Sequence, residues 1–463
     1  MNYENYNIKL GLIPTSRQVY NREDTIKYKN LIKEKLKELE IDFVDIDWLN
    51  EDGLLYDPRD VETIYKRFKS DEIDALFCPH CNFGMEEAVA KLAKSVNKPF
   101  LLWGPRDEAP TPEGDRLRDS LCGIFATSKV LKIMNVPFTY IENCRIEDSV
   151  FLDSLRNFIA AAAVVKKFNN LRIGQIGTRP QSFLTVMYNE EELLKKFGIE
   201  IIPITLIEII SGMNKIINKN DERIRSSIEY YKKEFNTCNF DDNVLTKIVA
   251  LKYAIRDWAE EERLSVVALQ CWNALQDSIG LMPCFVNSEL TGEGLPVVCE
   301  TDVCGAVTAI ITQVAAMGKT PTFFADLTIR HPENNNAVLL WHCGNFPYKL
   351  KKETEAGKII KHYMLSSNCP GVGEWEIKGG DISMCRFNGD NEKYKFLIAE
   401  GKGVDGPKTK GTYLWVELKD WISFEKKIVY GPYIHHIVGI HAKVSSVLKE
   451  ALKYIPDIEI DLI

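Results

Sequence analysis

The strongest constraint on the fold is the alternation of short apolar runs with amphipathic segments along the first part of the chain. The runs "IKLGLIP" at residues 8–14, "IDALFCP" at 73–79 and "PFLLWGP" at 99–105 are separated by helical patterns such as residues 86–96. Apolar runs this short are typical of strands that are buried on both faces, and helices between consecutive strands make those strands parallel. The pattern predicts a doubly wound α/β domain over residues 1–168.

Two further segments differ from this first one. A new strand, "RIGQIG" at residues 172–177, opens a second alternating pattern that we assign to residues 169–349. From residue 350 onward, alternating segments broken by Gly and Asn-Gly are typical of antiparallel hairpins. The sequence therefore predicts the α/β class, with two doubly wound parallel-sheet domains followed by a smaller β-rich C-terminal domain at 350–463. A length of 463 residues fits about three domains.

Charge and composition narrow the choice of partners. The net charge is −8 with acids and bases interspersed, which argues against a nucleic-acid groove and against an anionic membrane surface. The longest apolar run, "FIAAAAVV", is far shorter than a membrane span, and the first residues lack a secretory pattern. Twelve cysteines scattered singly suit reduced thiols. We expect a cytoplasmic protein that acts on a small molecule.

Cys78 and Cys81 have the C-x-x-C spacing of a redox site. A strand before them and a helix after them fit that reading, but the chain is several times larger than a thioredoxin-like domain. A zinc site would need two further ligands, and the sequence contains no second C-x-x-C motif. We favour a loop at the end of a buried strand.

Carboxylates and histidines follow several apolar runs in the second half of the chain. "VVCE" ends in Glu300, "FFAD" in Asp326 and "LLWH" in His342, while Asp302 lies two residues after Glu300. Three of the seven histidines lie within "HHIVGIH", residues 435–441. Singly, such an aspartate is usually a cap or turn residue, and such a histidine is usually a core group. Together they predict a site for a borderline divalent cation such as Mn²⁺, Co²⁺ or Zn²⁺.

These motifs resemble the L-fucose and L-arabinose isomerases, a family of metal-dependent aldose–ketose isomerases. The resemblance lies in E-x-D followed by a helix and then F-A-D, in the histidine of "LLWHCGN", and in the paired histidines with a third one five residues on. It is greatest over residues 265–345 and 428–445. The N-terminal strands and the three-domain order are also similar to the fucose branch.

The resemblance implies roles for individual residues. Glu300 and Asp326 would be metal ligands and would also transfer the proton, and His436 would be a metal ligand. His342 matches a ligand of the arabinose branch, whereas the aspartate at position 326 matches the fucose branch. The resemblance therefore leaves the fourth ligand open, and it leaves His342 and His435 open as substrate contacts.

Substrate contacts follow from the same resemblance and from residue chemistry. Gln270 resembles a sugar-contacting glutamine, and Arg17 resembles an arginine that a neighbouring subunit supplies. The indoles of Trp103 and Trp272 could hold the sugar, although a tryptophan is more often part of the core.

The expected activity is isomerisation of a free sugar through a cis-enediol intermediate, with Mn²⁺ or another divalent cation such as Co²⁺ or Mg²⁺ as cofactor. The sugar itself stays open among L-fucose-like, arabinose-like and 6-substituted hexoses such as sulfonated ones. The resemblance also implies a homo-oligomer, a hexamer, with shared active sites. Two alternatives remain: a non-catalytic sugar-binding or regulatory protein, and a metal-dependent aldolase or hydrolase that uses the same ligands.

Overall fold

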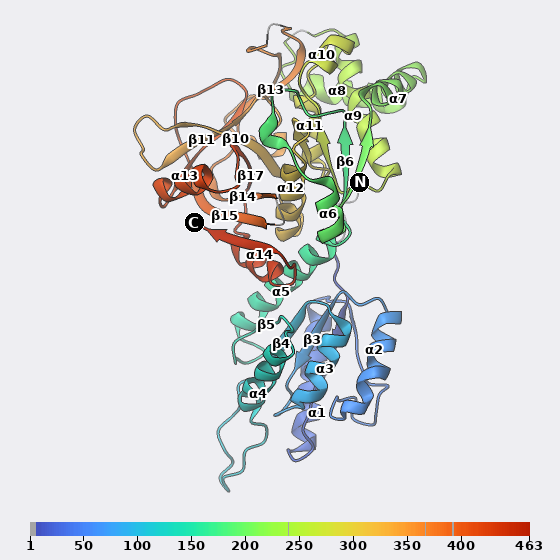
Figure 1. Cartoon of the computed structure of the whole chain (residues 1–463), viewed down its shortest axis with the longest axis vertical. Helices are drawn as coiled ribbons and strands as arrows, with labels where there is room; N and C mark the ends of the chain where they lie inside the picture. The colour runs from blue at the N-terminus through green and yellow to red at the C-terminus, as the bar shows by residue number, and fades with distance from the viewer. Residues whose placement is uncertain (1–5, 239, 366, 391–392) are drawn as a thin grey trace. The chain divides into compact units, whose positions relative to one another are not determined.

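A computed structural model describes residues 6–238, 240–365, 367–390 and 393–463. Contacts divide the described chain into two compact units (Figure 1). The N-terminal unit contains residues 6–166 together with the later segment 446–456, and the central unit contains residues 167–445 and 457–463. The predicted domain boundaries near residues 168 and 349 stay predictions.

The N-terminal unit is built on a parallel sheet in the order β2-β1-β3-β4-β5. Its strands are β1 (Leu10–Leu12), β2 (Phe43–Val44), β3 (Ala75–Pro79), β4 (Phe100–Trp103) and β5 (Thr139–Tyr140). Its helices are α1 (Arg22–Glu38), η1 (Pro58–Asp60), α2 (Val61–Ser70), α3 (Glu86–Val96), α4 (Ser120–Ile133), most of α5 (Ser149–Phe168) and most of α14 (Ser445–Leu452). The doubly wound parallel sheet that the sequence predicts here is confirmed.

Alternating side chains cover both faces of this sheet, as expected of a strand whose successive residues point to opposite sides. Leu76 and Cys78 of β3 belong to a core that also contains buried side chains of α2, α3 and α4. Phe77, between them, meets Phe151 of α5 and Trp103 instead. Cys78 thus lies inside a buried strand, in agreement with the structural interpretation of the C-x-x-C motif.

The first half of the central unit contains a second parallel sheet, in the order β7-β6-β8-β9. Its strands are β6 (Arg172–Ile176), β7 (Glu200–Ile204), β8 (Val266–Leu269) and β9 (Val297–Cys299). Its helices are η2 (Leu184–Val186), α6 (Glu190–Phe197), α7 (Leu206–Asn218), α8 (Glu222–Glu234), α9 (Asp242–Glu261), α10 (Ala274–Ile279), α11 (Cys284–Gly292) and α12 (Val303–Ala315).

The second half of the central unit is a mainly antiparallel sheet in the order β12-β13-β16-β11-β10-β17-β14-β15-β18. Because β16 also pairs with β15, the strands from β16 through β15 close into a barrel. The strands are β10 (Thr322–Arg330), β11 (Ala337–His342), β12 (Lys358–Lys361), β13 (Pro370–Glu376), β14 (Gly380–Asp390), β15 (Lys393–Val404), β16 (Thr412–Leu418), β17 (His436–Ile440) and β18 (Ile458–Leu462), with η3 (Tyr348–Leu350) and α13 (Trp421–Tyr430) between them.

The sequence pattern predicts that β10 and β11 belong to the second parallel sheet. This prediction is wrong. Both strands are antiparallel members of the barrel. Their apolar composition does not distinguish a strand of a parallel sheet from one covered by a helix on one face and by barrel core on the other. Asp326 is therefore an inner residue of a long strand and not its last residue.

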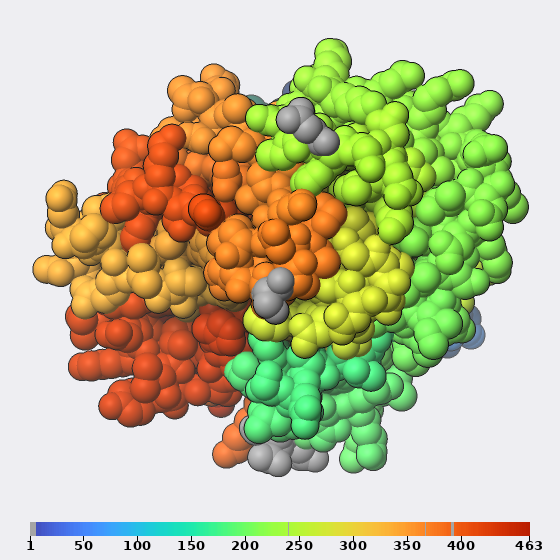
Figure 2. All heavy atoms as spheres, turned by 90° about the horizontal axis from the view of Figure 1, so that it is seen from above, coloured from blue at the N-terminus to red at the C-terminus, as the bar shows by residue number. Residues whose placement is uncertain are grey.

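Helix α12 lies between the two halves of the central unit. All of its residues are buried, and it contacts β6 and β8 on one side and β10, β14 and β17 on the other. A helix that is apolar on every side requires such a position. Figure 2 shows the two halves next to each other, the parallel part in green and yellow and the barrel part in orange and red. The first turn of α12 consequently lies where the two sheets meet.

Within the residues that the structure describes, no helix combines the length and the apolar character that a membrane span requires.

Candidate active site

The turn between β9 and α12 holds Glu300, Thr301 and Asp302 in an uncommon backbone conformation. Glu300 has φ +59° and Thr301 has φ +51°, in the left-handed region that branched L-residues rarely adopt. The amide of Thr301 donates to the carbonyl of Leu269 at 3.1 Å, which ties the turn to the end of β8. Backbone strain of this kind concentrates at functional sites, where the surrounding structure enforces it.

Asp302 caps α12 and joins two buried side chains from the barrel. Its carboxylate accepts from the amide of Gly305 at 2.8 Å and from the guanidinium of Arg386 at 2.5 and 3.0 Å. It also accepts from Nδ1 of His436 at 2.8 Å. Burial alone would raise the pKa of Asp302, but Arg386 and His436 hold it well below its usual range. A charged Asp302 therefore holds a proton on Nδ1 of His436, so Nε2 is the nitrogen that can release its proton and bind a cation.

Glu300 and Asp326 converge on Nε2 of His436. Nε2 of His436 lies 3.0 Å from Oε2 of Glu300 and 3.5 Å from Oδ1 of Asp326. The strand register explains the second distance, because Asp326 of β10 and His436 of β17 are direct cross-strand partners. Two elements that are distant in sequence, a strained turn and a strand pair, thus bring the three side chains together.

This arrangement fits a divalent cation. Oε2 of Glu300, Oδ1 of Asp326 and Nε2 of His436 are buried, and apart from the 3.0 Å approach of Glu300 to His436 they have no hydrogen-bond partner among the described residues. Buried polar atoms normally have a partner, so three such atoms side by side indicate an absent ligand. One imidazole nitrogen and carboxylate oxygens suit Mn²⁺, Co²⁺ or Zn²⁺. His435 is a neighbouring candidate, since single donor atoms of Asp326, His435 and His436 all lie within 4.8 Å of one another.

The two carboxylates differ in their electrostatic surroundings. Burial raises the pKa of Glu300, but His436 and the indole of Trp272 outweigh it and lower that pKa to about 2. Burial also raises the pKa of Asp326, and Glu300 adds to the rise. Two adjacent carboxyl groups whose pKa values are moved in opposite directions are typical of sites that transfer protons.

The adjacent histidines His435 and His436 differ in their electrostatic surroundings. Burial opposes a charge on His436, yet Asp302 and Glu300 raise its pKa to about 9. His435 is partly exposed, but the protein around its ring and the adjacent His436 lower its pKa to about 4. His436 is the residue of the pair that points its Nε2 at both carboxylates.

His342 ends β11, next to the strand that carries Asp326. Its Nδ1 accepts a hydrogen bond from the backbone amide of Cys343 at 2.9 Å, and its buried Nε2 has no hydrogen-bond partner in the described parts of the chain. Phe324 lies between the two imidazoles, with ring centroids 5.8 Å from His342 and 4.8 Å from His436. His342 is thus near the three converging side chains but outside the tight group.

A cavity of about 700 Å³ has a lining that includes Phe183, Gln270, Trp272 and Asn273. The indole N–H of Trp272 donates to Oε1 of Glu300 at 3.1 Å, so one side chain connects the cavity wall to the carboxylate. The volume is in the range of small-molecule sites. The structure therefore brings two predicted substrate residues, Gln270 and Trp272, to one cavity.

The other two predicted contacts, Arg17 and Trp103, belong to the N-terminal unit. Asn82 accepts from the backbone amide of Arg17 at 2.8 Å, and the Arg17 side chain pairs with Glu86 and lies over the ring of Phe83. Trp103 is fully buried and packs 4.6 Å from Phe151, measured between ring centroids.

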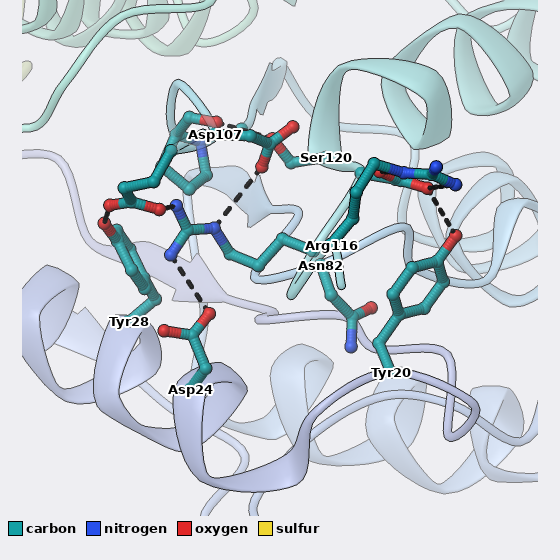
Figure 3. A network of polar contacts seen from close by, with 12 residues as sticks. Tyr20, Asp24, Tyr28, Asn82, Asp107, Arg116 and Ser120 are labelled. Carbon is teal, nitrogen blue, oxygen red and sulfur yellow. Dashed lines mark hydrogen bonds and ion pairs between the residues drawn. The ribbon is translucent and has the colours of Figure 1, made fainter. Parts of the chain in front are cut away.

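The loops around Arg17 are held by a polar network (Figure 3). Asn82 donates to Ser16 and Thr25 across the carboxyl end of the parallel sheet. Nearby, buried Arg118 pairs with Asp24 at 3.0 Å and with Asp107 at 3.3 Å. The carboxyl end is where doubly wound sheets place ligand-binding residues, and this network orders that end.

Sequence reasoning missed Arg386 and the role of Asp302. A signal was present, because Arg386 is a lone cation within the run "ISMCRF" on an alternating strand. A charged residue in such a run requires a buried counter-ion. The sequence could not show which carboxylate meets it.

Comparisons with known proteins agree with this geometry. Residues 11–169 match the fucose/sulfoquinovose isomerase N-terminal domain, and residues 340–462 match the L-fucose isomerase C-terminal domain. A protein of Alkalicoccus urumqiensis named sulfoquinovose isomerase is 26% identical over 414 residues, covering 88% of this chain and 90% of that protein. A sulfoquinovose isomerase of Priestia aryabhattai is 25% identical over 385 residues, covering 82% and 84%.

The protein is an enzyme, a sugar isomerase, and this excludes the alternative of a non-catalytic sugar-binding module. It belongs to the fucose/sulfoquinovose isomerase family.

Proposed function

We propose that the chain interconverts an aldose and its ketose with the help of a divalent cation held by Glu300, Asp326 and His436. The observation that carries the proposal is the convergence of three buried metal-ligating atoms that lack hydrogen-bond partners outside their own group. A cation such as Mn²⁺, bound there, would stabilise negative charge on adjacent sugar oxygens. The family membership supports the reaction type.

In this proposal Glu300 and Asp326 move the proton between C2 and C1 through a cis-enediol. Glu300 stays ionised beside His436, and Trp272 orients it by donating to Oε1. Asp326, whose pKa is raised, is the carboxyl group better able to hold a proton. Opposite pKa shifts of two facing carboxyl groups are what a base and an acid need.

The first sugar to test is 6-sulfonated, because the relatives are named for sulfoquinovose. The cavity beside Trp272 would hold the sugar, with Gln270 as a polar contact. By the family resemblance, Arg17 of a neighbouring subunit would complete the site in a homo-oligomer, a hexamer. The guanidinium of Arg17, held in one position, suits a sulfonate.

The test is ketose formation from sulfonated, 6-deoxy and pentose aldoses with Mn²⁺ added. Glu300→Gln and Asp326→Asn should each lower kcat by at least about 10²-fold, the lower range for a general base. The exposed Glu425→Gln on α13 is the matched control and should leave the rate unchanged. Retention of more than about a tenth of the wild-type rate in either site variant would contradict the base roles.

Running the same reaction in D₂O tests the route of the hydrogen. A proton held on a carboxyl oxygen can exchange with solvent, so deuterium at C1 of the ketose is expected. A product free of deuterium would favour direct hydride transfer or a proton shuttle fully shielded from solvent, and the base roles would then depend on the two carboxylate variants.

A further inference from the structure

His342 and His436 occupy adjoining parts of the site, but their surroundings place the ring proton on opposite nitrogens. Nδ1 of His436 meets a carboxylate, Asp302, at 2.8 Å. A carboxylate can only accept, so this Nδ1 carries a proton, and Nε2 is the nitrogen that can release its proton and bind a cation. Nδ1 of His342 instead meets an N–H, the backbone amide of Cys343, at 2.9 Å. An amide can only donate, so this Nδ1 keeps the lone pair and Nε2 carries the proton.

A protonated Nε2 cannot bind a cation, since a metal needs the free lone pair.

The donor lacks an acceptor. Nε2 of His342 is buried and makes no hydrogen bond with any described residue. The sulfur of Cys299 interacts electrostatically with His342, but it already receives the amide groups of Asn287 at 3.5 Å and Asn345 at 3.4 Å. Sulfur is also a weak acceptor. A buried N–H without a partner destabilises the protein, which is consistent with a partner that arrives with the substrate.

We propose that His342 is a hydrogen-bond donor to an oxygen of the bound sugar and is not a metal ligand. The proposal rests on the proposed isomerase function. In that reaction negative charge gathers on sugar oxygens near Glu300 and Asp326, and His342 is close enough to both carboxylates to interact with them electrostatically. A buried donor aimed at such an oxygen stabilises the charge as it develops.

The first test measures cation affinity, which does not depend on turnover. Mn²⁺ binding is titrated by calorimetry for the wild type, His342→Ala, His342→Gln and His436→Ala. We expect the His342 variants to stay within about threefold of the wild-type Kd, while His436→Ala weakens binding by more than about tenfold. A loss of more than about tenfold in His342→Ala overturns the proposal, because it would make His342 a ligand.

The second test measures the donor role. His342→Ala should lower kcat/KM by about 10²- to 10³-fold, the range for loss of one such donor. His342→Gln, whose side-chain amide offers an N–H near the former Nε2, should recover at least about tenfold of that loss. Binding of the corresponding alditol to the Mn²⁺-loaded protein gives the same comparison without turnover.

The outcomes separate the two proposals. A wild type that binds Mn²⁺ and alditol but converts no aldose contradicts the isomerase function and leaves the His342 comparison intact. Wild-type values for His342→Ala in both sugar turnover and alditol binding overturn the donor role. Urea unfolding of each variant shows whether it is folded. If His342→Ala does not fold, His342→Gln is used in its place.

Discussion

Asp302 and Arg386 form a buried ion pair that acts on the site through His436. Both side chains are 1% exposed, and the carboxylate is shared between the guanidinium and the imidazole. Taking two charges out of water is costly, and mutual attraction offsets that cost only when the geometry is good. Here the pair also fixes the tautomer of His436, a proposed ligand. That role gives a reason why this buried position holds two charged residues and not apolar ones.

Removing Arg386 should therefore destabilise the fold more than breaking an exposed ion pair does. We expect Arg386→Met to lower the free energy of unfolding by about 3–5 kcal/mol, because Asp302 is left buried without its cation. Arg59→Met, which breaks the exposed pair with Asp57, should leave it nearly unchanged. Urea titrations without metal measure both values. If the double variant Asp302→Asn, Arg386→Met is no more stable than Arg386→Met alone, the uncompensated carboxylate is not the cause.

His80 in the N-terminal unit predicts a pH dependence of stability. Burial lowers its pKa to about 4, and Nδ1 donates to the carbonyl of Phe83 at 2.8 Å. An unfolded histidine titrates near 6.5, so between pH 6.5 and 4 the unfolded chain binds a proton that the folded ring refuses. Stability should fall by about 3 kcal/mol as the pH drops through this window and be fully present above it.

His80→Asn is the matched variant, because its amide can still donate to Phe83 but cannot titrate. Unfolding free energies at pH 7 and pH 4.5 should differ less in this variant than in the wild type. Equal differences in the two proteins would contradict the role of His80.

Strand β10 shows how the fold positions chemistry through register. Its pairing with β17 sets Asp326 opposite His436 and Phe323 opposite Gly439. The same pairing therefore fixes both a pair of proposed ligands and a close contact between a ring and a glycine. A disturbance at one point of this ladder is expected to move the other.

Gly439→Ala tests this coupling. A Cβ at Gly439 would overlap the ring of Phe323, which is fully buried and cannot move aside. We expect a loss of about 1–3 kcal/mol in unfolding free energy, together with weaker Mn²⁺ binding. Gly212→Ala on α7 is the control, since its Cβ would meet its nearest neighbour at an ordinary 3.6 Å. Normal Mn²⁺ affinity in a destabilised Gly439→Ala would show that register and site are independent.

The sequence predicted both parallel sheets and the β-rich end, because period and run length record burial directly. It also indicated Glu300, Asp326 and His436, which the structure brings together. It could not assign β10 to the barrel, since an apolar strand looks alike in either sheet. Nor could it give the tautomers of His342 and His436, which depend on Cys343 and Asp302 as hydrogen-bond partners.

The proposed substrate residues lie in both units of the chain. Glu300, Gln270 and Trp272 lie in the central unit, and Arg17 lies in the N-terminal unit on loops ordered by Asn82. The family resemblance implies that Arg17 acts on a neighbouring subunit. Activity would then depend on assembly and not only on the fold of one chain.

Mixing two inactive variants tests shared sites. Arg17→Ala and Glu300→Gln, co-expressed so that they assemble together, should recover part of the activity that each lacks alone, because some sites then combine two intact contributions. Light scattering measures the mass of the assemblies. A monomeric mass, or inactive mixed oligomers, would contradict the sharing of sites.

The segment 446–456 completes the N-terminal unit although it is encoded near the other end of the chain. Helix α14 buries Leu448 and Ala451, and Tyr454 donates to the carbonyl of Phe100 beside β4. At typical translation rates the ribosome makes this segment on the order of tens of seconds after residue 166. The emerging chain must hold an unfinished first unit, with apolar surface uncovered, during that interval. Yield in cells should accordingly depend on chaperones that bind nascent chains.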